Sequence, residues 1–320
     1  MIEYLLLVLG LIFLSKGADY LVDGSSSLAK KFSIPTLVIG LTIVAFGTST
    51  PELIINIFAT LGNNGEIAFG NVIGSCIANI LLILGMCALI TQMKIKQSTI
   101  WKEIPLAFIA LLVVFIFSNI LFLDNIEMKF LTRSEGLILI IFFLIFLSYV
   151  YSMAKTGKGK EDYNIEIKKL SNLKIGAYII GGLTALILGG QWTVEGAIII
   201  ARNLGISEFL IASTIVAVGT SLPELITSVK AAMKNDVDLA VGNIVGSNIF
   251  NILFVLGITA IVNPILFPEL VAFDLLLALI ATGLLFAFIF IGKRYHLTKV
   301  EGIIFLVLYI IYLAIIIFRG

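Results

Sequence analysis

Apolar runs long enough to cross a lipid bilayer recur from one end of this 320-residue chain to the other. A membrane-spanning helix needs about 20 mostly apolar residues, because the hydrocarbon core of a bilayer is about 30 Å thick. Hydrophobic residues make up 60% of the chain and charged residues only 13%, against roughly 25% charged residues in an ordinary soluble domain. The sequence therefore predicts an all-α polytopic membrane protein.

Ten such runs can be placed, and one polar segment divides them into five and five. The runs cover residues 2–22, 34–60, 66–90, 102–123, 134–153, 174–198, 206–231, 237–262, 269–291 and 299–318. We expect a first half over residues 1–153, a cytoplasmic linker over 154–173 and a second half over 174–320. The N-terminal run lacks a basic start and a clear cleavage site, so we interpret it as the first span and not as a removable signal.

Lysine and arginine residues orient these spans, because cytoplasmic loops carry an excess of positive charge. With the N-terminus outside, the inner loops hold 16 of the 21 basic residues and the outer loops hold four. Both termini are therefore predicted to lie outside. The short chain leaves no room in the linker for a regulatory domain, which favours a prokaryotic plasma membrane.

The two halves repeat each other at a shift of 172 residues. This shift aligns GNVIGSCIANILLILG (70–85) with GNIVGSNIFNILFVLG (242–257), and ten of the sixteen positions are identical. Each half has five spans, and an odd number means that the second copy enters the membrane from the opposite side. The pattern predicts two inverted five-helix repeats, an architecture in which transporters place the substrate site at the midplane between the repeats.

A second repeated motif, GTSTPEL at 47–53 and GTSLPEL at 219–225, places a proline and a glutamate within apolar spans. A charge at the bilayer centre costs about 2.5–3.5 kcal/mol on insertion scales, so something must offset the charges of Glu52 and Glu224. Proline has no N–H and disfavours helix before it, so we expect helices 2 and 7 to break at the midplane. The breaks should free the carbonyls of Ala45, Thr48, Ala217 and Thr220. Carboxylates, carbonyls and hydroxyls together form an all-oxygen site suited to Ca²⁺ or Na⁺.

Each half adds a serine and an asparagine at helical spacing. Ser75 and Asn79 are four residues apart, as are Ser247 and Asn251, and such pairs share one face of a helix. We therefore expect each pair to contribute a hydroxyl and an amide oxygen to the site. Asn71 and Asn243, which precede these pairs, are as easily helix caps as ligands.

Acidic residues near span ends are expected in interfacial or packing roles. They are Asp19, Asp23 and Glu195, together with Gln191. Asp23 and Glu195 match across the repeat, which also makes a role in cation entry worth testing. Cys76 and Cys87 both lie in one apolar segment, so no disulfide framework is expected.

These motifs resemble the two alpha-repeats of the sodium/calcium exchanger family, within the calcium/cation antiporter superfamily. The resemblance is specific over residues 40–85 and 212–257 and implies a ten-span antiporter that exchanges Na⁺ for Ca²⁺. It implies a calcium site made by Glu52, Glu224 and the carbonyls of Thr48 and Thr220. It implies sodium sites made by Ser49, Ser75, Ser221, Ser247 and the carbonyls of Ala45 and Ala217, with Asn79 and Asn251 completing the centre.

The residues also bear on the coupling ion. Potassium-dependent relatives have an aspartate where this chain has Asn251, so potassium co-transport is less expected. The proton-coupled branch places its acid in a Gly-Asn-x-x-Glu pattern that is absent around Glu52 and Glu224, so Ca²⁺/H⁺ exchange is the weaker alternative. Two carboxylates balance one Ca²⁺ or two Na⁺, so the ions should compete. The glycine-rich first and sixth spans are candidates for the moving element.

Other classes of protein fit less well. A cation channel could use the same carboxylates, but channels usually gather several identical subunits around a pore, whereas this chain carries its own two-fold pairing. No arrangement typical of an intramembrane enzyme is present, so we expect no catalysis and no cofactor. Ca²⁺, Na⁺ and the lipid bilayer are the expected partners. No basic face with interleaved aromatic residues suggests nucleic acid, and no obligate protein partner is evident.

Overall fold

The computed structural model describes residues 2–62, 64–118, 130–156, 167–205, 217–291 and 293–319. These residues are mostly helical and include eight helices long and apolar enough to span a membrane, or nine if one bent pair is counted as a span. Large apolar side chains such as Ile141, Leu144 and Ile145 lie exposed along the helices, where a bilayer would cover them. The predicted all-α polytopic membrane fold is confirmed. The first half of the expected seventh span, residues 206–216, lies outside the described residues.

The described helices follow the expected spans closely. In the first half they are α1 (Ile2–Phe32), α2 (Thr36–Ile39), η1 (Gly40–Val44), α3 (Ala45–Thr48), α4 (Thr50–Leu61), α5 (Gly65–Ala78), η2 (Asn79–Leu84), α6 (Gly85–Ile90), η3 (Thr99–Glu103), α7 (Ile104–Ser118) and α9 (Arg133–Thr156). In the second half they are α10 (Asn172–Asn203), α12 (Ala217–Gly219), α13 (Leu222–Met233), α14 (Val237–Ile249), η5 (Phe250–Val255), α15 (Leu256–Val262), α16 (Val271–Phe288) and α17 (Lys299–Arg319). The η segments are π-helical, a local widening that is frequent at functional sites.

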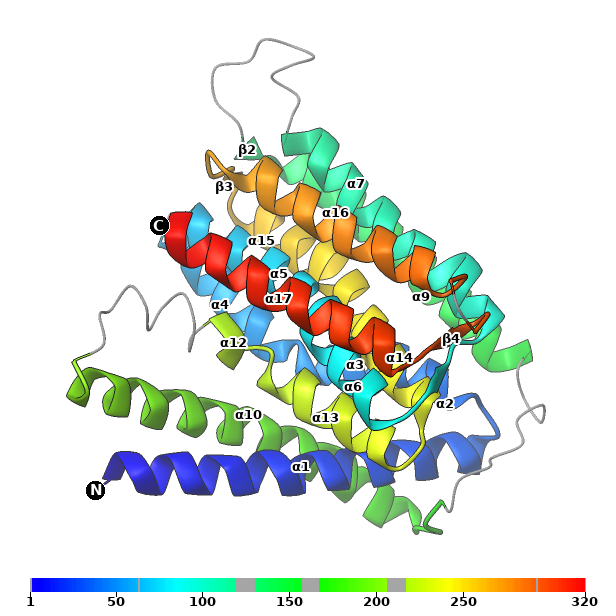
Figure 1. Ribbon diagram of the computed structural model, residues 1–320. Coiled ribbons are helices and arrows are strands. Elements are labelled where there is room, and N and C mark those ends of the chain that lie inside the picture. The colour runs from blue at the N-terminus through cyan, green and yellow to red at the C-terminus, as the bar shows by residue number, and fades with distance from the viewer. Residues whose placement is uncertain are drawn as a thin grey trace.

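Helices α1 and α10 lie side by side along one face of the molecule (Figure 1). They run antiparallel, because Gly10 approaches Gly189 while Gly17 approaches Gly182. A methyl group built on Gly17 would lie 2.9 Å from the Gly182 carbonyl oxygen, and one on Gly182 would lie 2.8 Å from the Gly17 oxygen. Only glycine permits backbones this close, as in other membrane helix pairs joined by small residues.

The remaining helices surround two central spans. About 83% of the most apolar stretch of Val237–Val262 and 72% of that of Ile67–Ile90 are buried, compared with 22–39% for the other long spans. These spans carry the GNIVGSNIFN and GNVIGSCIAN motifs. The two most buried spans are therefore the ones that carry these polar motifs, which identifies the centre of the helix assembly as the place to look for a site.

Two short antiparallel ribbons connect outer helices. Strand β1 (Met93–Lys94) pairs with β4 (His296–Leu297), and β2 (Phe130–Leu131) pairs with β3 (Ile265–Leu266). Strands β2 and β3 lie at one end of the bundle and β4 lies at the other (Figure 1). Shifting β1 by 172 residues gives β3, so each half contributes the corresponding strand at opposite ends.

An ion-pair cluster ties one end of α1 to its neighbours. Lys230 pairs with Asp19 at 3.2 Å, while Lys234 and Lys168 each approach an oxygen of Asp23 at 2.7 Å. These contacts agree with the packing role expected for Asp19 and Asp23. Because two lysines already occupy the carboxylate of Asp23, its geometry does not favour a role in attracting cations.

The connection between α13 and α14 adds a polar contact to the same cluster. Asp236 caps α14 by accepting the Leu239 N–H at 3.1 Å, and Ser26 of α1 donates to its other oxygen at 2.8 Å. Burial raises the pKa of the Asp236 carboxyl above its ordinary value, and these two hydrogen bonds oppose that rise. The last third of α1 is thereby joined to the α13–α14 connection by both charge and hydrogen bonding.

Candidate functional site

Both glutamate motifs interrupt a helix with nearly the same backbone geometry. Helix α3 ends at Thr48 and α4 begins at Thr50, with a bend of 44° across the break. Helix α12 ends at Gly219 and α13 begins at Leu222. The residues at the breaks, Ser49 (φ −86°, ψ 7°) and Ser221 (φ −87°, ψ 6°), match closely. Proline in the first turn of each new helix explains the break, since its nitrogen has no hydrogen to donate to the preceding turn.

Glu52 and Glu224 lie in the first turns of α4 and α13 and are buried to 0% and 1% exposure. One carboxylate oxygen of each, Oε2, is buried without a hydrogen-bond partner in the described part of the chain. The positive end of a helix dipole favours a carboxylate in the first turn, but it does not satisfy a buried oxygen. An unpaired buried charge is costly, and a cation bound between the two glutamates would compensate both free oxygens.

Four serines connect the two carboxylates across the halves of the chain. Ser49 donates to Glu224 Oε1 at 2.9 Å and lies 3.0 Å from Ser247 Oγ. Ser221 lies 3.2 Å from Ser75 Oγ, and Ser75 reaches Glu52 Oε1 at 3.5 Å. The Ser49–Ser247 and Ser221–Ser75 contacts are related by the 172-residue shift. The structure therefore brings together the two glutamates and the four serines that the sequence singled out.

Asn71 and Asn243 brace the helices that carry the glutamates. Asn71 donates to Asn56 Oδ1 at 2.6 Å and to the Glu52 carbonyl oxygen at 3.2 Å. Asn243 likewise donates to Ser228 at 2.9 Å and reaches the Glu224 carbonyl at 3.4 Å. The capping alternative for Asn71 and Asn243 is wrong, because the capping side chains are Asn64 for α5 and Asp236 for α14. Equal spacing of Asn56 and Ser228 in the repeat was the signal that could have identified these partners.

The threonines before the breaks differ in their surroundings. Thr48 is buried, and its hydroxyl lies 3.0 Å from the Val44 carbonyl oxygen and 3.1 Å from Asn243 Oδ1. Thr220 occupies the turn between α12 and α13 and is partly buried. The contact between Thr48 and Asn243 therefore joins the two halves in addition to the serine contacts.

The expectation that the break frees the carbonyl of Ala45 is wrong. That oxygen accepts the Ser49 N–H at 3.0 Å, because the helical hydrogen bonding of α3 continues as far as Ser49, the residue at the break. In the second half the Ser221 N–H donates to Val218 at 3.1 Å and not to Ala217. The two breaks thus share dihedral angles at the serine but differ in the hydrogen bonding before it.

Asn79 is the first residue of the π-helical segment η2, and Asn251 is the second residue of the π-helical segment η5. Both are fully buried. Asn79 Oδ1 has no hydrogen-bond partner in the described chain, and in Asn251 both Oδ1 and Nδ2 lack one. The five side-chain atoms without partners on Glu52, Glu224, Asn79 and Asn251 include four oxygens, which is the ligand type that hard cations prefer.

The arrangement can hold hard cations and is poorly suited to soft ones. Its donors are carboxylate, hydroxyl and amide oxygens, while the thiols of Cys76 and Cys87 are free and buried, as expected. No group of three or more His, Cys, Asp or Glu side chains gathers anywhere in the described residues. Such an oxygen-rich site with two negative charges favours Na⁺ or Ca²⁺ over Zn²⁺ or copper.

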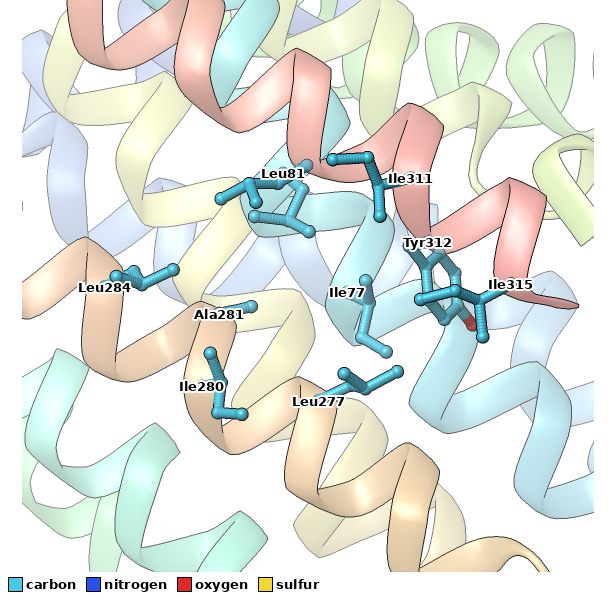
Figure 2. Close-up of a pocket in the computed structure, with 10 residues that line it drawn as sticks. Ile77, Leu81, Leu277, Ile280, Ala281, Leu284, Ile311, Tyr312 and Ile315 are labelled. Atoms are coloured by element: carbon cyan, nitrogen blue, oxygen red, sulfur yellow. The ribbon is translucent and has the colours of Figure 1, made fainter.

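A separate apolar pocket lies on the flank of the molecule. Figure 2 shows its lining side chains on the helices that carry Ile77 and Leu81, Leu277 and Leu284, and Ile311. Its lining includes no charged residue, and Tyr312 supplies its one side-chain hydroxyl. This pocket offers nothing to compensate an ion, so the buried carboxylates remain the candidate cation site.

Comparison with known proteins gives a consistent result. The family model described as sodium/calcium exchanger protein matches residues 2–152 and 174–318. The sodium/calcium exchanger MaX1 of Methanosarcina acetivorans is 32% identical over 344 residues, covering 98% of each chain. The putative antiporter CaxA of Alkalimonas amylolytica is 36% identical over 319 residues, again covering 98% of each. A solved structure of the sodium-calcium exchanger NCX_Mj, soaked with 10 mM Na⁺ and zero Ca²⁺, superposes with a TM-score of 0.82 at 32% identity over 98% of both chains.

Proposed function

The chain belongs to the sodium/calcium exchanger protein family, and we propose that it exchanges Na⁺ for Ca²⁺ by alternating access at the buried Glu52–Glu224 site. The observation that carries this proposal is the pair of buried carboxylates, each with an oxygen that no described protein group satisfies. The relatives named for sodium/calcium exchange and NCX_Mj, whose structures were soaked with Na⁺ and with Sr²⁺, support these ions as substrates.

Competition between the ions follows from the charge of the site. Two carboxylates neutralise one Ca²⁺ or two Na⁺, and both ions would use the same oxygens of Glu52 and Glu224. A site loaded with either ion is close to neutral and can become enclosed by protein. An empty site carries two buried negative charges, whose desolvation opposes closure. The protein should therefore cross between its states loaded, which is the condition for exchange.

We propose the ten-span inverted repeat as the framework for this movement. The correspondences between Ser49–Ser247 and Ser221–Ser75, between Gly10–Gly189 and Gly182–Gly17, and between strands β1 and β3 support it. In such a framework α1 and α10 form one moving unit, because their backbones touch at the glycines. The other helices, which hold the site residues, form the stationary part.

The ion-pair cluster on α1 makes the two ends of this moving unit unequal. By the 172-residue shift, the positions of Lys230 and Lys234 correspond to Phe58 and Gly62 in the first half. The first half therefore has no lysines at these positions that could hold α10 in the way that Lys230 and Lys234 hold Asp19 and Asp23 of α1. We propose that these pairs, which include Lys168 of the linker, hold α1 against α13 at that end.

Replacing both Lys230 and Lys234 with glutamine should loosen this end of the molecule. Partly exposed ion pairs contribute about 1 kcal/mol or less each, so amide hydrogen exchange of residues 233–237 should become faster by roughly tenfold. Hydrogen-exchange mass spectrometry measures this directly. Lys155→Gln, at an exposed position near the end of α9, is the control and should leave the exchange unchanged. Equal exchange in the double variant and the wild type would contradict the proposed role.

Calcium uptake into proteoliposomes tests the proposed function. Vesicles loaded with Na⁺ and diluted into Na⁺-free buffer should accumulate Ca²⁺, whether or not K⁺ is present. Dissipating a pH gradient should not change the uptake. Uptake that needs a pH gradient would identify Ca²⁺/H⁺ exchange, uptake that needs K⁺ would identify the potassium-dependent alternative, and flux without a counter-ion would identify a channel.

A further inference from the structure

The two halves of the site differ at one pair of matched positions near its centre. The 172-residue shift aligns Cys76 with Asn248, and Asn79 with Asn251. Cys76 and Asn248 also contact each other, since the Cys76 thiol lies 4.0 Å from the Asn248 carbonyl oxygen. One half therefore has a thiol and the other an amide at a position where the two halves meet. The surroundings of Asn79 and Asn251 can be compared on this basis.

A chain of hydrogen bonds fixes how Asn79 is turned. The backbone carbonyl of Cys76 can only accept, so Asn248 must present its Nδ2 to it, which it does at 3.3 Å. The other end of that amide, Oδ1, then faces Asn79 and accepts its Nδ2 at 2.8 Å. Asn79 is left with its Oδ1 free and buried. Because the Cys76 carbonyl can only accept a hydrogen bond, it fixes which end of the Asn248 amide faces it, and Asn248 in turn fixes the orientation of the Asn79 amide.

Asn251 has no such support. The position matching Asn248 holds Cys76, whose thiol offers no strong acceptor, and both Oδ1 and Nδ2 of Asn251 are buried without partners among the described residues. No group in the described part of the chain determines which end of this amide faces the site. A cation attracts the oxygen end and repels the amide hydrogens, so an amide held in the right sense binds it with less reorganisation.

We propose that Asn248 is a positioning residue that turns the Asn79 oxygen toward the transported cation, and that Cys76 leaves Asn251 without the matching support. This inference rests on the proposed function. The two asparagines then differ before the ion binds. The side chain of Asn79 already presents its oxygen to the site, whereas the side chain of Asn251 turns its oxygen toward the site only when Ca²⁺ binds.

Equilibrium binding of ⁴⁵Ca²⁺ to the purified full chain, combined with a double-mutant cycle, tests this assignment. Asn248→Ala should raise the Ca²⁺ concentration for half-saturation by about tenfold, which is the effect of losing one hydrogen bond that prepares a ligand. In an Asn79→Ala background the same change should add less than about twofold, because Asn248 acts through Asn79. In an Asn251→Ala background the effect should remain about tenfold. Cys76→Ala is the matched control and should change binding by less than about twofold.

The opposite change gives a test that does not depend on removing a buried amide. Cys76→Asn supplies Asn251 with the acceptor that Asn79 has, and should lower the half-saturating Ca²⁺ concentration by roughly threefold. This gain should disappear in an Asn251→Ala background. A tenfold loss from Asn248→Ala that persists in Asn79→Ala, or a Cys76→Asn protein that binds no more tightly, would overturn the proposal. Wild-type protein that fails to couple Ca²⁺ uptake to Na⁺ would instead overturn the proposed function, so the two failures are distinct.

Discussion

Glu52→Gln and Glu224→Gln should each lower Na⁺-driven Ca²⁺ uptake by at least about 100-fold. Each change keeps the shape of the side chain but leaves one buried negative charge to balance the two positive charges of Ca²⁺. Removing one partner of a buried charge pair typically costs about 3–5 kcal/mol, and 2.7 kcal/mol already corresponds to about 100-fold. Uptake into proteoliposomes at a fixed Na⁺ gradient measures the effect.

Glu103→Gln is the matched control for these variants. Glu103 is also a fully buried carboxylate in a membrane span, and like Glu52 and Glu224 it has one oxygen, Oε2, without a hydrogen-bond partner among the described residues. It differs from them by lying in η3, away from the helix breaks, where Tyr149 donates to its other oxygen. We expect its uptake to remain within about threefold of the wild type, because Gln keeps the size of the side chain and can still accept the hydrogen bond from Tyr149, while no transported charge depends on this carboxylate. Equal losses in all three variants would show that any buried carboxylate is required for folding, and would contradict a specific role of Glu52 and Glu224.

Gly182→Ala should strongly impair both stability and transport, whereas the neighbouring Gly181→Ala should not. A methyl group at Gly182 would lie 2.7 Å from the Leu21 nitrogen and 2.8 Å from the Gly17 carbonyl oxygen, so α1 and α10 would have to separate. Overpacking of this kind costs typically 1–3 kcal/mol. A methyl group at Gly181 meets nothing within 4 Å, and alanine is about 1 kcal/mol better than glycine within a helix.

Thermal unfolding in detergent and Na⁺-driven uptake measure the two glycine variants side by side. We expect a lower Tm and a reduced uptake rate for Gly182→Ala, and an equal or higher Tm with unchanged uptake for Gly181→Ala. Because the two glycines are adjacent in α10, a difference between the two variants could not be explained by membrane depth or by helix propensity. A Gly182→Ala protein that is as stable and as active as the wild type would contradict the close packing of α1 against α10.

Much of the architecture could be predicted from local features of the sequence. The apolar runs gave span positions that agree with the described helices within a few residues at most ends, although α1 extends to Phe32, well past the expected residue 22. Proline and glycine placed the helix breaks correctly, because these residues act on the backbone locally. The repeated motifs also identified Glu52, Glu224 and the four serines, which the structure brings together.

Contacts between distant residues could not be predicted in the same way. Lys230 and Lys234 meet Asp19 and Asp23 only because α13 packs against α1, and no local pattern encodes that pairing. The carbonyl of Ala45 keeps its helical partner although a proline follows closely, since the effect of proline depends on which N–H is removed. Asn71 and Asn243 brace the glutamate-bearing helices, a role that depends on how α4 packs on α5 and α13 on α14.

The most direct test of the central claim is whether Na⁺ and Ca²⁺ compete for one site on the purified protein. Equilibrium binding of ⁴⁵Ca²⁺ would be measured at increasing Na⁺, with ionic strength held constant by a large organic cation. If the ions share the carboxylates, Na⁺ should raise the half-saturating Ca²⁺ concentration without lowering the number of Ca²⁺ sites. A plot of the logarithm of that concentration against the logarithm of the Na⁺ concentration should then have a slope greater than one, because more than one Na⁺ displaces each Ca²⁺. Ca²⁺ binding that is unaffected by Na⁺ would contradict a common site at Glu52 and Glu224.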